Sequence, residues 1–299
     1  MAVERTVLSG GVRLAVHDHS GTGRPVVLLH GLAGHSGEWD ATAAWMSERH
    51  RVIAVDQRGQ GASERHPADV SRAAYVADVI AVIEVPYGDR AGHGSSMHGH
   101  PEPRPTEART GHTACRNTDD GGPEPVVLVG QSLGGHTAML VAAARPDLVR
   151  ALVMVEASPG LPDAGGVAGV ERWLASWPVP FPSPAAAARF FGGGAAGAGW
   201  AAGLEEREDG WWPRFDPALM VRSLTDASPR SFWREWEQVA CPTLVVLAES
   251  GIIPSVDADE MRRTRPDTVM AHIPGAGHDV HLEAPGLLRA AIEDFLEAR

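Results

Sequence analysis

Seven short apolar runs recur along the 299-residue chain, and helix-like segments separate most of them. Several runs contain consecutive β-branched or aliphatic residues without alternation, a pattern typical of strands covered on both faces. The runs are GVRLAVHD (11–18), PVVLLHG (25–31), RVIAVD (51–56), PVVLVG (125–130), RALVMVEA (150–157), PTLVVLAE (242–249) and DTVMAHIP (267–274). The alternation predicts an α/β fold with a doubly wound, mostly parallel sheet, whose chemistry lies beyond the carboxyl ends of the strands.

Residues 88–123 interrupt this rhythm without any periodic apolar pattern. They are rich in glycine, proline, threonine and histidine, which predicts a surface insertion outside the packed core. The segment contains five residues of types that bind metals: His93, His98, His100, His112 and Cys115. Their spacing matches no established zinc pattern, so we expect no metal site there.

Residues 160–236 form a second interruption, which contains seven of the nine tryptophans and five of the six phenylalanines. Because this aromatic, proline-punctuated segment lies between two strand-like runs, it is predicted to be a helical lid over the carboxyl edge of the sheet. Residues 1–159 and 237–299 would then form the core. Trp173 and Trp177 are candidates for lining an apolar substrate pocket, although a single lid tryptophan also serves to pack the lid onto the core.

The charge and cysteine content restrict the partners and the compartment. A net charge of −12 disfavours nucleic acids and anionic membranes as partners and leaves a small-molecule substrate as the expectation. Two cysteines, Cys115 and Cys241, supply no disulfide framework and fit a reducing compartment. The first residues include Glu4 and lack a signal-peptide core, and no run of about eighteen apolar residues occurs, so we expect a cytoplasmic protein. The oligomeric state stays open.

Ser132 lies where an apolar run ends and a helical segment begins, in VVLVGQSLGGHTAML (126–140). Gly130 and Gly134 stand two positions away on either side, as a very sharp strand-to-helix turn requires, because its neighbours come too close for side chains. Such a turn pushes the hydroxyl clear of the backbone at the amino end of a helix, where free N–H groups favour developing negative charge. The spacing matches neither G-x-G-x-x-G nor a G-K-[ST] phosphate loop. Ser132 is therefore the candidate nucleophile.

A serine nucleophile needs a base to remove its proton. His278, in HIPGAGHDVHLEAP (272–285), lies in a loop between the last strand-like run and a closing helix predicted to begin near Ala284. A loop at the carboxyl edge of the sheet can bring its imidazole to the serine, so His278 is the candidate base. His281 is the alternative within the loop, and its other possible role is packing or hydrogen bonding beneath the final helix.

Two backbone N–H groups are predicted to stabilise an oxyanion. One belongs to Leu133, which follows the nucleophile, and the other to Leu32 in the loop LLHGLAGHSGEWD (28–40). Glycine in this loop allows its backbone to approach the site closely. Three residues of the loop are candidates for the substrate site: Gly31, His35 and Trp39.

Four separated motifs resemble those of the α/β-hydrolase superfamily. They occur in the order HG (30–31), DQRGQGAS (56–63), GQSLGG (130–135) and GAGH (275–278). Their agreement spans nearly the whole chain and is far more specific than any one motif. The resemblance implies a sheet of about eight strands, a lid after the sixth strand, and a catalytic serine, acid and histidine in chain order, with Ser132 and His278 at two of these positions. A serine here disfavours the mechanism of haloalkane dehalogenases and epoxide hydrolases, which use a carboxylate nucleophile.

The acid departs from the pattern of this superfamily. Its members commonly carry the acid just after the seventh strand, yet the matching stretch, LAESGIIP (247–254), has Gly251 where an aspartate would fall. Three carboxylates are candidates to replace it: Glu156, Glu249 and Asp257. Glu156 ends the sixth strand, beside the nucleophile strand, and is our first choice. Its alternative role is a structural carboxylate at the hinge of the lid.

These residues predict a serine hydrolase that cleaves a carboxylic ester, lactone or related acyl bond of a small, largely apolar molecule through an acyl-enzyme on Ser132. On the same fold, a carbon–carbon bond hydrolase or a cofactor-free peroxidase-like enzyme is the alternative. A different class is a hydrolase-like receptor with weak or no turnover, which Gly251 keeps open. The sequence shows no nucleotide loop or flavin fingerprint, so we expect no cofactor.

Overall fold

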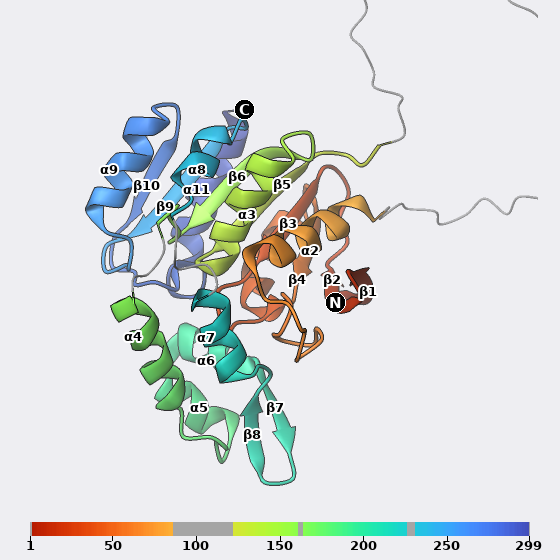
Figure 1. Cartoon of the computed structure of the whole chain (residues 1–299), viewed down its shortest axis with the longest axis vertical. Coiled ribbons are helices and arrows are strands. Elements are labelled where there is room, and N and C mark those ends of the chain that lie inside the picture. The colour runs from red at the N-terminus through yellow and green to blue at the C-terminus, as the bar shows by residue number, and fades with distance from the viewer. Residues whose placement is uncertain (1, 86–121, 161–163, 226–230, 299) are drawn as a thin grey trace, which may run out of the picture.

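The computed structural model describes residues 2–85, 122–160, 164–225 and 231–298. A sheet with helices on both faces forms the upper part of Figure 1, and a smaller group of elements lies below it. The predicted insertion at 88–123 falls almost wholly outside the described residues, as do the five candidate metal ligands within it.

Within the described residues, eight strands form one sheet in the order β1-β2-β4-β3-β5-β6-β9-β10. The strands are β1 (Val3–Ser9), β2 (Val12–Asp18), β3 (Pro25–Leu29), β4 (Arg51–Val55), β5 (Val126–Gln131), β6 (Val149–Val155), β9 (Thr243–Ala248) and β10 (Val269–Ile273). β1 pairs with β2 and β2 with β4 in antiparallel fashion, and all other neighbours are parallel. The predicted fold class is confirmed. The apolar pattern does not mark β1, because the first four residues of this edge strand are exposed.

In the part of the chain that the structure describes, seven α-helices and a short 3-10 helix cover the two faces of the sheet. They are η1 (Ser36–Trp39), α1 (Asp40–Met46), α2 (Arg72–Glu84), α3 (Leu133–Ala144), α8 (Trp233–Gln238), α9 (Ser255–Thr264), α10 (Val280–Glu283) and α11 (Pro285–Glu297). Helix α2 begins where the sequence predicts, because the Ser71 side chain accepts a hydrogen bond from the N–H of Ala74 at 3.3 Å.

The central strand β5 shows why its sequence is apolar without alternation. All six of its residues are buried. Val126 and Leu128 pack into the apolar layer that α2, α3, α8 and α9 cover, whereas Val127 and Val129 pack into the layer beneath α1 and α11. Both faces of the strand are therefore removed from water, as expected for a parallel sheet enclosed by helices.

The lid follows β6, as predicted. Its elements are α4 (Ala164–Ala175), α5 (Pro184–Phe190), α6 (Gly194–Ala202), β7 (Leu204–Arg207), β8 (Gly210–Pro213) and α7 (Pro217–Thr225). They form the green and teal group in the lower part of Figure 1. Alongside the four helices, the lid contains an antiparallel hairpin of β7 and β8, which the sequence pattern does not mark. Phe232 and Trp236, at the end of the predicted lid range, pack into the layer beside α3 instead.

One apolar cluster joins the lid to the core, and we call it the lid cluster. Its buried members are Ala33, Val70, Tyr75, Leu133, Leu174, Trp177, Phe181, Ala187, Ala201, Leu204, Phe215, Leu219 and Met220. Leu133 follows the candidate nucleophile and Ala33 follows Leu32, so the aromatic lid covers the carboxyl edge of the sheet at the predicted site. Among the described residues, no helix is both long and apolar enough to cross a bilayer.

Candidate active site

Ser132 occupies a strained backbone position between β5 and α3. Its φ of 50° and ψ of −116° lie in a region that side-chain-bearing residues rarely adopt. A Cβ atom on Gly130 would overlap the backbone of Gly134, so the two flanking glycines are what permits this turn. The N–H of Ser132 donates to the carbonyl of Val155 at 2.9 Å, which ties the turn to β6. The residue is half-buried at the amino end of α3.

The loop after β3 approaches this turn closely. A Cβ atom on Gly31 would overlap the side chain of Gln131 and lie 3.5 Å from the Cβ of Ser132. Each N–H of residues 33–38 has an acceptor, whereas the N–H of Leu32 has none among the described residues. Leu133 is the first residue of α3, so no carbonyl of that helix accepts its N–H. Two unused N–H donors therefore lie near the serine: Leu133 follows it in sequence, and Leu32 follows Gly31, which approaches it in space.

Glu156 follows β6 with a positive φ of 48°, and its side chain is fully buried. Its Oε1 accepts the N–H of Ala248 at 2.7 Å, and its Oε2 accepts the N–H of Ile252 at 2.8 Å. In the parallel pairing of β5 with β6, Gln131 lies opposite Val155, so Ser132 and Glu156 leave the sheet at the same height on adjacent strands.

His278 contacts this carboxylate. Its Nδ1 lies 3.4 Å from Oε2 of Glu156, and its side chain keeps 29% of its surface exposed. Because a carboxylate only accepts, the contact favours the ring form with the proton on Nδ1 and leaves Nε2 free to take a proton. The side-chain amide of Gln131 donates to the carbonyl of His278 at 3.1 Å, which holds the histidine loop against the residue before Ser132.

The other two candidate acids have different partners. Glu249 is exposed and accepts the N–H of Gly275 at 2.7 Å, and Asp257 accepts the Ser158 hydroxyl at 2.8 Å. The structure also explains the glycine in the usual acid position: a Cβ atom on Gly251 would overlap the carboxylate of Glu156. The space that an aspartate at this position would need is taken by the glutamate from β6.

His281, the alternative base, is fully buried and contacts Glu38 at 3.3 Å between Nε2 and Oε2. Burial alone would raise the pKa of Glu38, but the hydrogen bond from His281 and the nearby histidines outweigh it and lower that pKa. Trp39 stacks on the ring of His281 at 4.7 Å and is fully buried in the core. The Trp39 side chain belongs to the packed layer that includes residues of α11, and this placement argues against the predicted position at the border of the substrate pocket.

The lid is attached through α6 to both loops that carry candidate site residues. Nε2 of His35 donates to the carbonyl of Gly199 at 3.0 Å, so this candidate joins the loop after β3 to the lid. The indole of Trp200 donates to a carboxylate oxygen of Asp279, next to His278, at 2.8 Å. Sequence reasoning did not single out Trp200, since its only signal is membership of the aromatic segment.

The two candidate lid tryptophans differ in exposure. Trp177 is 7% exposed and belongs to the lid cluster, whereas Trp173 is 39% exposed and meets the Trp177 ring edge-on at 5.2 Å. Trp177 therefore packs the lid, and Trp173 retains a free face beside it.

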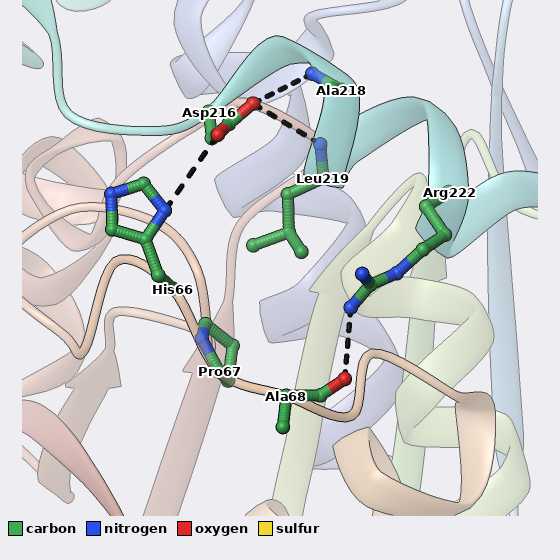
Figure 2. A pocket seen from close by; sticks show the side chains of 7 residues that line it. All are labelled: His66, Pro67, Ala68, Asp216, Ala218, Leu219 and Arg222. Carbon is green, nitrogen blue, oxygen red and sulfur yellow. Dashed lines mark hydrogen bonds and ion pairs between the residues drawn. The ribbon is translucent and has the colours of Figure 1, made fainter.

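A surface groove of about 380 Å³ lies elsewhere, between the loop at 66–68 and α7. As Figure 2 shows, its polar groups bond to one another: Asp216 accepts the N–H groups of Ala218 and Leu219, and Arg222 donates to the carbonyl of Ala68 at 2.9 Å. The hydrogen bond from Arg222 to Ala68 therefore links the lid to the core across this groove. In the described part of the chain, no three His, Cys, Asp or Glu side chains are grouped to hold a metal ion.

Comparisons with known proteins agree with this architecture. The sequence is similar to 2-(acetamidomethylene)succinate hydrolase of Mesorhizobium japonicum, with 26% identity over 99% of this chain and 96% of the relative. It is also similar to sn-1-specific diacylglycerol lipase ABHD11 of Mus musculus, with 28% identity over 91% of this chain and 80% of the relative.

Solved structures show the same fold. E-2-(acetamidomethylene)succinate hydrolase superposes with a TM-score of 0.79 at 23% identity and covers 99% of this chain and 100% of its own. The enol-lactonase from Burkholderia xenovorans LB400 superposes with a TM-score of 0.70 at 15% identity and covers 98% and 100%. The profile of the alpha/beta hydrolase family matches residues 26–291, from β3 into α11. The chain therefore belongs to the alpha/beta hydrolase family.

Proposed function

We propose that the protein is a serine hydrolase that cleaves a carboxylic ester, lactone or related acyl bond of a small molecule through an acyl-enzyme on Ser132. The observation that carries this proposal is the contact between His278 and Glu156 beside the strained serine turn. Both relatives described above bear the names of hydrolytic enzymes, which supports this class of reaction.

Acylation begins when the Ser132 hydroxyl oxygen attacks the carbonyl carbon of the substrate. His278 takes the hydroxyl proton on Nε2, and the Glu156 carboxylate stabilises the imidazolium that forms. The carbonyl oxygen becomes an oxyanion, which the N–H groups of Leu32 and Leu133 stabilise. When the tetrahedral intermediate collapses, His278 returns the proton to the leaving alcohol.

Deacylation repeats these steps with water as the nucleophile. His278 removes a proton from the water while its oxygen attacks the acyl carbon, and then protonates the Ser132 oxygen as the acid product leaves. The same two N–H groups hold the second oxyanion. The aromatic lid restricts access of bulk water to the acyl-enzyme and favours substrates with an apolar portion.

The test is labelling of Ser132 together with turnover of p-nitrophenyl acetate and butyrate. Wild-type protein should form one fluorophosphonate adduct at Ser132, and Ser132→Ala should lose the adduct and lower kcat/KM by roughly 10⁴-fold or more. Ser47→Ala is the control, because the Ser47 hydroxyl only donates to the carbonyl of Ala44 just after α1. Absence of both turnover and adduct in the wild type would contradict the proposal.

Three other functions are alternatives on this fold: a carbon–carbon bond hydrolase, a peroxidase-like enzyme and a receptor without turnover. A carbon–carbon bond hydrolase would use the same serine and histidine on a dienone acid, so a panel containing such acids and peracid assays distinguishes it and a peroxidase-like enzyme from an esterase. A receptor without turnover needs no base, and the carboxylate that orients His278 favours the enzyme over the receptor.

A further inference from the structure

Arg72, the first residue of α2, is a buried cation that has no counter-ion among residues 2–85, 122–160, 164–225 and 231–298. Arg72 is only 7% exposed, and neither its Nε nor its Nη1 has a hydrogen-bond partner in the described part of the chain. The guanidinium carbon lies 5.8 Å from the centre of the Tyr75 ring. Burial lowers the pKa of Arg72 to about 10, although Tyr75 acts in the opposite direction. A buried charge of this kind is unfavourable unless something pairs with it.

The position of Arg72 connects it to the candidate active site. Tyr75, one turn further along α2, belongs to the lid cluster together with Ala33 and Leu133. Leu133 is the residue after Ser132 and the first residue of α3. Helix α2 packs against α3. In Figure 1 the amino end of α2 lies close to the amino end of α3. Through Tyr75, the guanidinium adjoins the lid cluster, which also contains the residue after the candidate nucleophile.

Two more buried donors without partners lie on the same cluster. Gln60 accepts the N–H of Ala33 with its Oε1 at 2.6 Å, which orients its amide and leaves its Nε2 without a partner. The indole N–H of Trp177 is also buried and unpaired. All three groups donate and none accepts, so the region is chemically complementary to a ligand rich in acceptors.

We propose that Arg72 is the anion-binding subsite of the active site and that it pairs with a free carboxylate of the substrate. This inference rests on the proposed function, because it assigns the substrate class of that same site. A guanidinium binds a carboxylate through two parallel hydrogen bonds. One arginine neutralises one negative charge, so a monoanionic carboxylate leaves a neutral buried pair, whereas a phosphate dianion would leave an excess charge. The substrate is then an ester, lactone or related acyl compound that also carries a carboxylate.

Half-esters of dicarboxylic acids test the proposal. The kcat/KM values of mono-p-nitrophenyl succinate, glutarate and adipate are compared with those of the neutral butyrate, pentanoate and hexanoate, after subtraction of spontaneous hydrolysis. Wild-type protein should prefer at least one half-ester to its neutral counterpart, and Arg72→Met should lower that preference roughly 10- to 100-fold. Arg72→Lys should retain part of it. Arg222→Met is the matched control, because Arg222 is an exposed arginine whose guanidinium donates to the carbonyl of Ala68.

A preference that is absent in the wild type, or unchanged in Arg72→Met, overturns the proposal. Equilibrium binding separates this failure from failure of the proposed function. In the Ser132→Ala background, calorimetric titration with glutarate should show binding that Arg72→Met weakens at least tenfold, whether or not the wild type hydrolyses esters. Equal Arg72-dependent binding of phosphate would overturn the assignment to a carboxylate, and absence of glutarate binding would overturn the subsite.

Thermal unfolding distinguishes a binding role from a structural one. Because Arg72→Met replaces an unpaired buried charge with an apolar side chain, the Tm without ligand should rise by roughly 2–4 °C. A lower Tm would mean that Arg72 stabilises the fold through its charge, contrary to the proposal.

Discussion

Replacement of Glu156 by glutamine tests the catalytic centre with a single change of charge and almost no change of shape. The carboxylate accepts two backbone N–H groups, from Ala248 at 2.7 Å and from Ile252 at 2.8 Å, and it contacts Nδ1 of His278 at 3.4 Å. All three partners therefore meet a group that accepts on both oxygens. A glutamine amide accepts on one side only and donates on the other.

Glu156→Gln should lower both the free energy of unfolding and the rate of hydrolysis. At least one N–H group loses its acceptor in Glu156→Gln, which costs about 1–3 kcal/mol of the free energy of unfolding. If the amide nitrogen faces His278, it donates to Nδ1 and moves the ring proton to Nε2, where it blocks removal of the serine proton. We expect kcat/KM to fall on the order of 10³- to 10⁴-fold.

The assay is hydrolysis of p-nitrophenyl butyrate from pH 6 to 9, with urea unfolding of each variant to establish that it is folded. Glu249→Gln is the control, because Glu249 is exposed and bonds to the N–H of Gly275; its kcat/KM should change less than about threefold. A folded Glu156→Gln protein with wild-type kcat/KM would refute the assignment of the acid.

The glycine at position 251 allows a compensating change. Gly251→Asp alone should be strongly impaired, because its Cβ overlaps the Glu156 carboxylate. The double variant Glu156→Gly with Gly251→Asp removes this overlap and places a carboxylate in the usual position of the superfamily. It should recover at least tenfold in kcat/KM over Glu156→Gly alone. No recovery would show that the neighbourhood of Gly251 does not reach His278.

Two further predictions concern stability. Trp39→Ala should lower the free energy of unfolding by about 3–5 kcal/mol in urea titrations, because the fully buried ring packs on His281; a loss below 1 kcal/mol would contradict its place in the core. For Asp56, burial raises the pKa, but the hydrogen bond from His17 and those from backbone N–H groups outweigh it, so the pKa lies below its ordinary value. Because its pKa is lower in the folded state, ionised Asp56 stabilises the fold at pH values above its unfolded pKa, near 3.9, and this stabilisation is lost as the pH falls. The wild-type protein should therefore lose more free energy of unfolding between pH 5 and pH 3 than Asp56→Asn. Equal losses would count against this role.

Much of the site could be predicted because its signals are local. A sharp strand-to-helix turn requires small residues near Ser132, and Gly130 and Gly134, two positions away on either side, meet this requirement. The helix cap at Ser71 is equally local. Trp39 could not be placed in the same way, because its sequence neighbours are loop residues and its burial depends on His281, more than two hundred residues further along the chain.

The candidate acid was likewise predictable only in part from local sequence. The sequence marks a gap at Gly251 and offers three carboxylates, but only the packing of β6 beside β9 brings Glu156 into the space above that glycine. Arg72 is ordinary in sequence, at the start of a helix, and only the folded chain shows that it is buried with Nε and Nη1 unpaired among the described residues.

The sequence by itself determined the parallel sheet, the position of the lid and the serine turn, since hydrophobic periodicity and backbone sterics act between residues close in the chain. The tertiary structure alone decided which carboxylate meets His278, which aromatic rings are core, and which charge is left unpaired. These depend on distances between strand ends and loops far apart in sequence, and electrostatic and packing energies follow such distances rather than order along the chain.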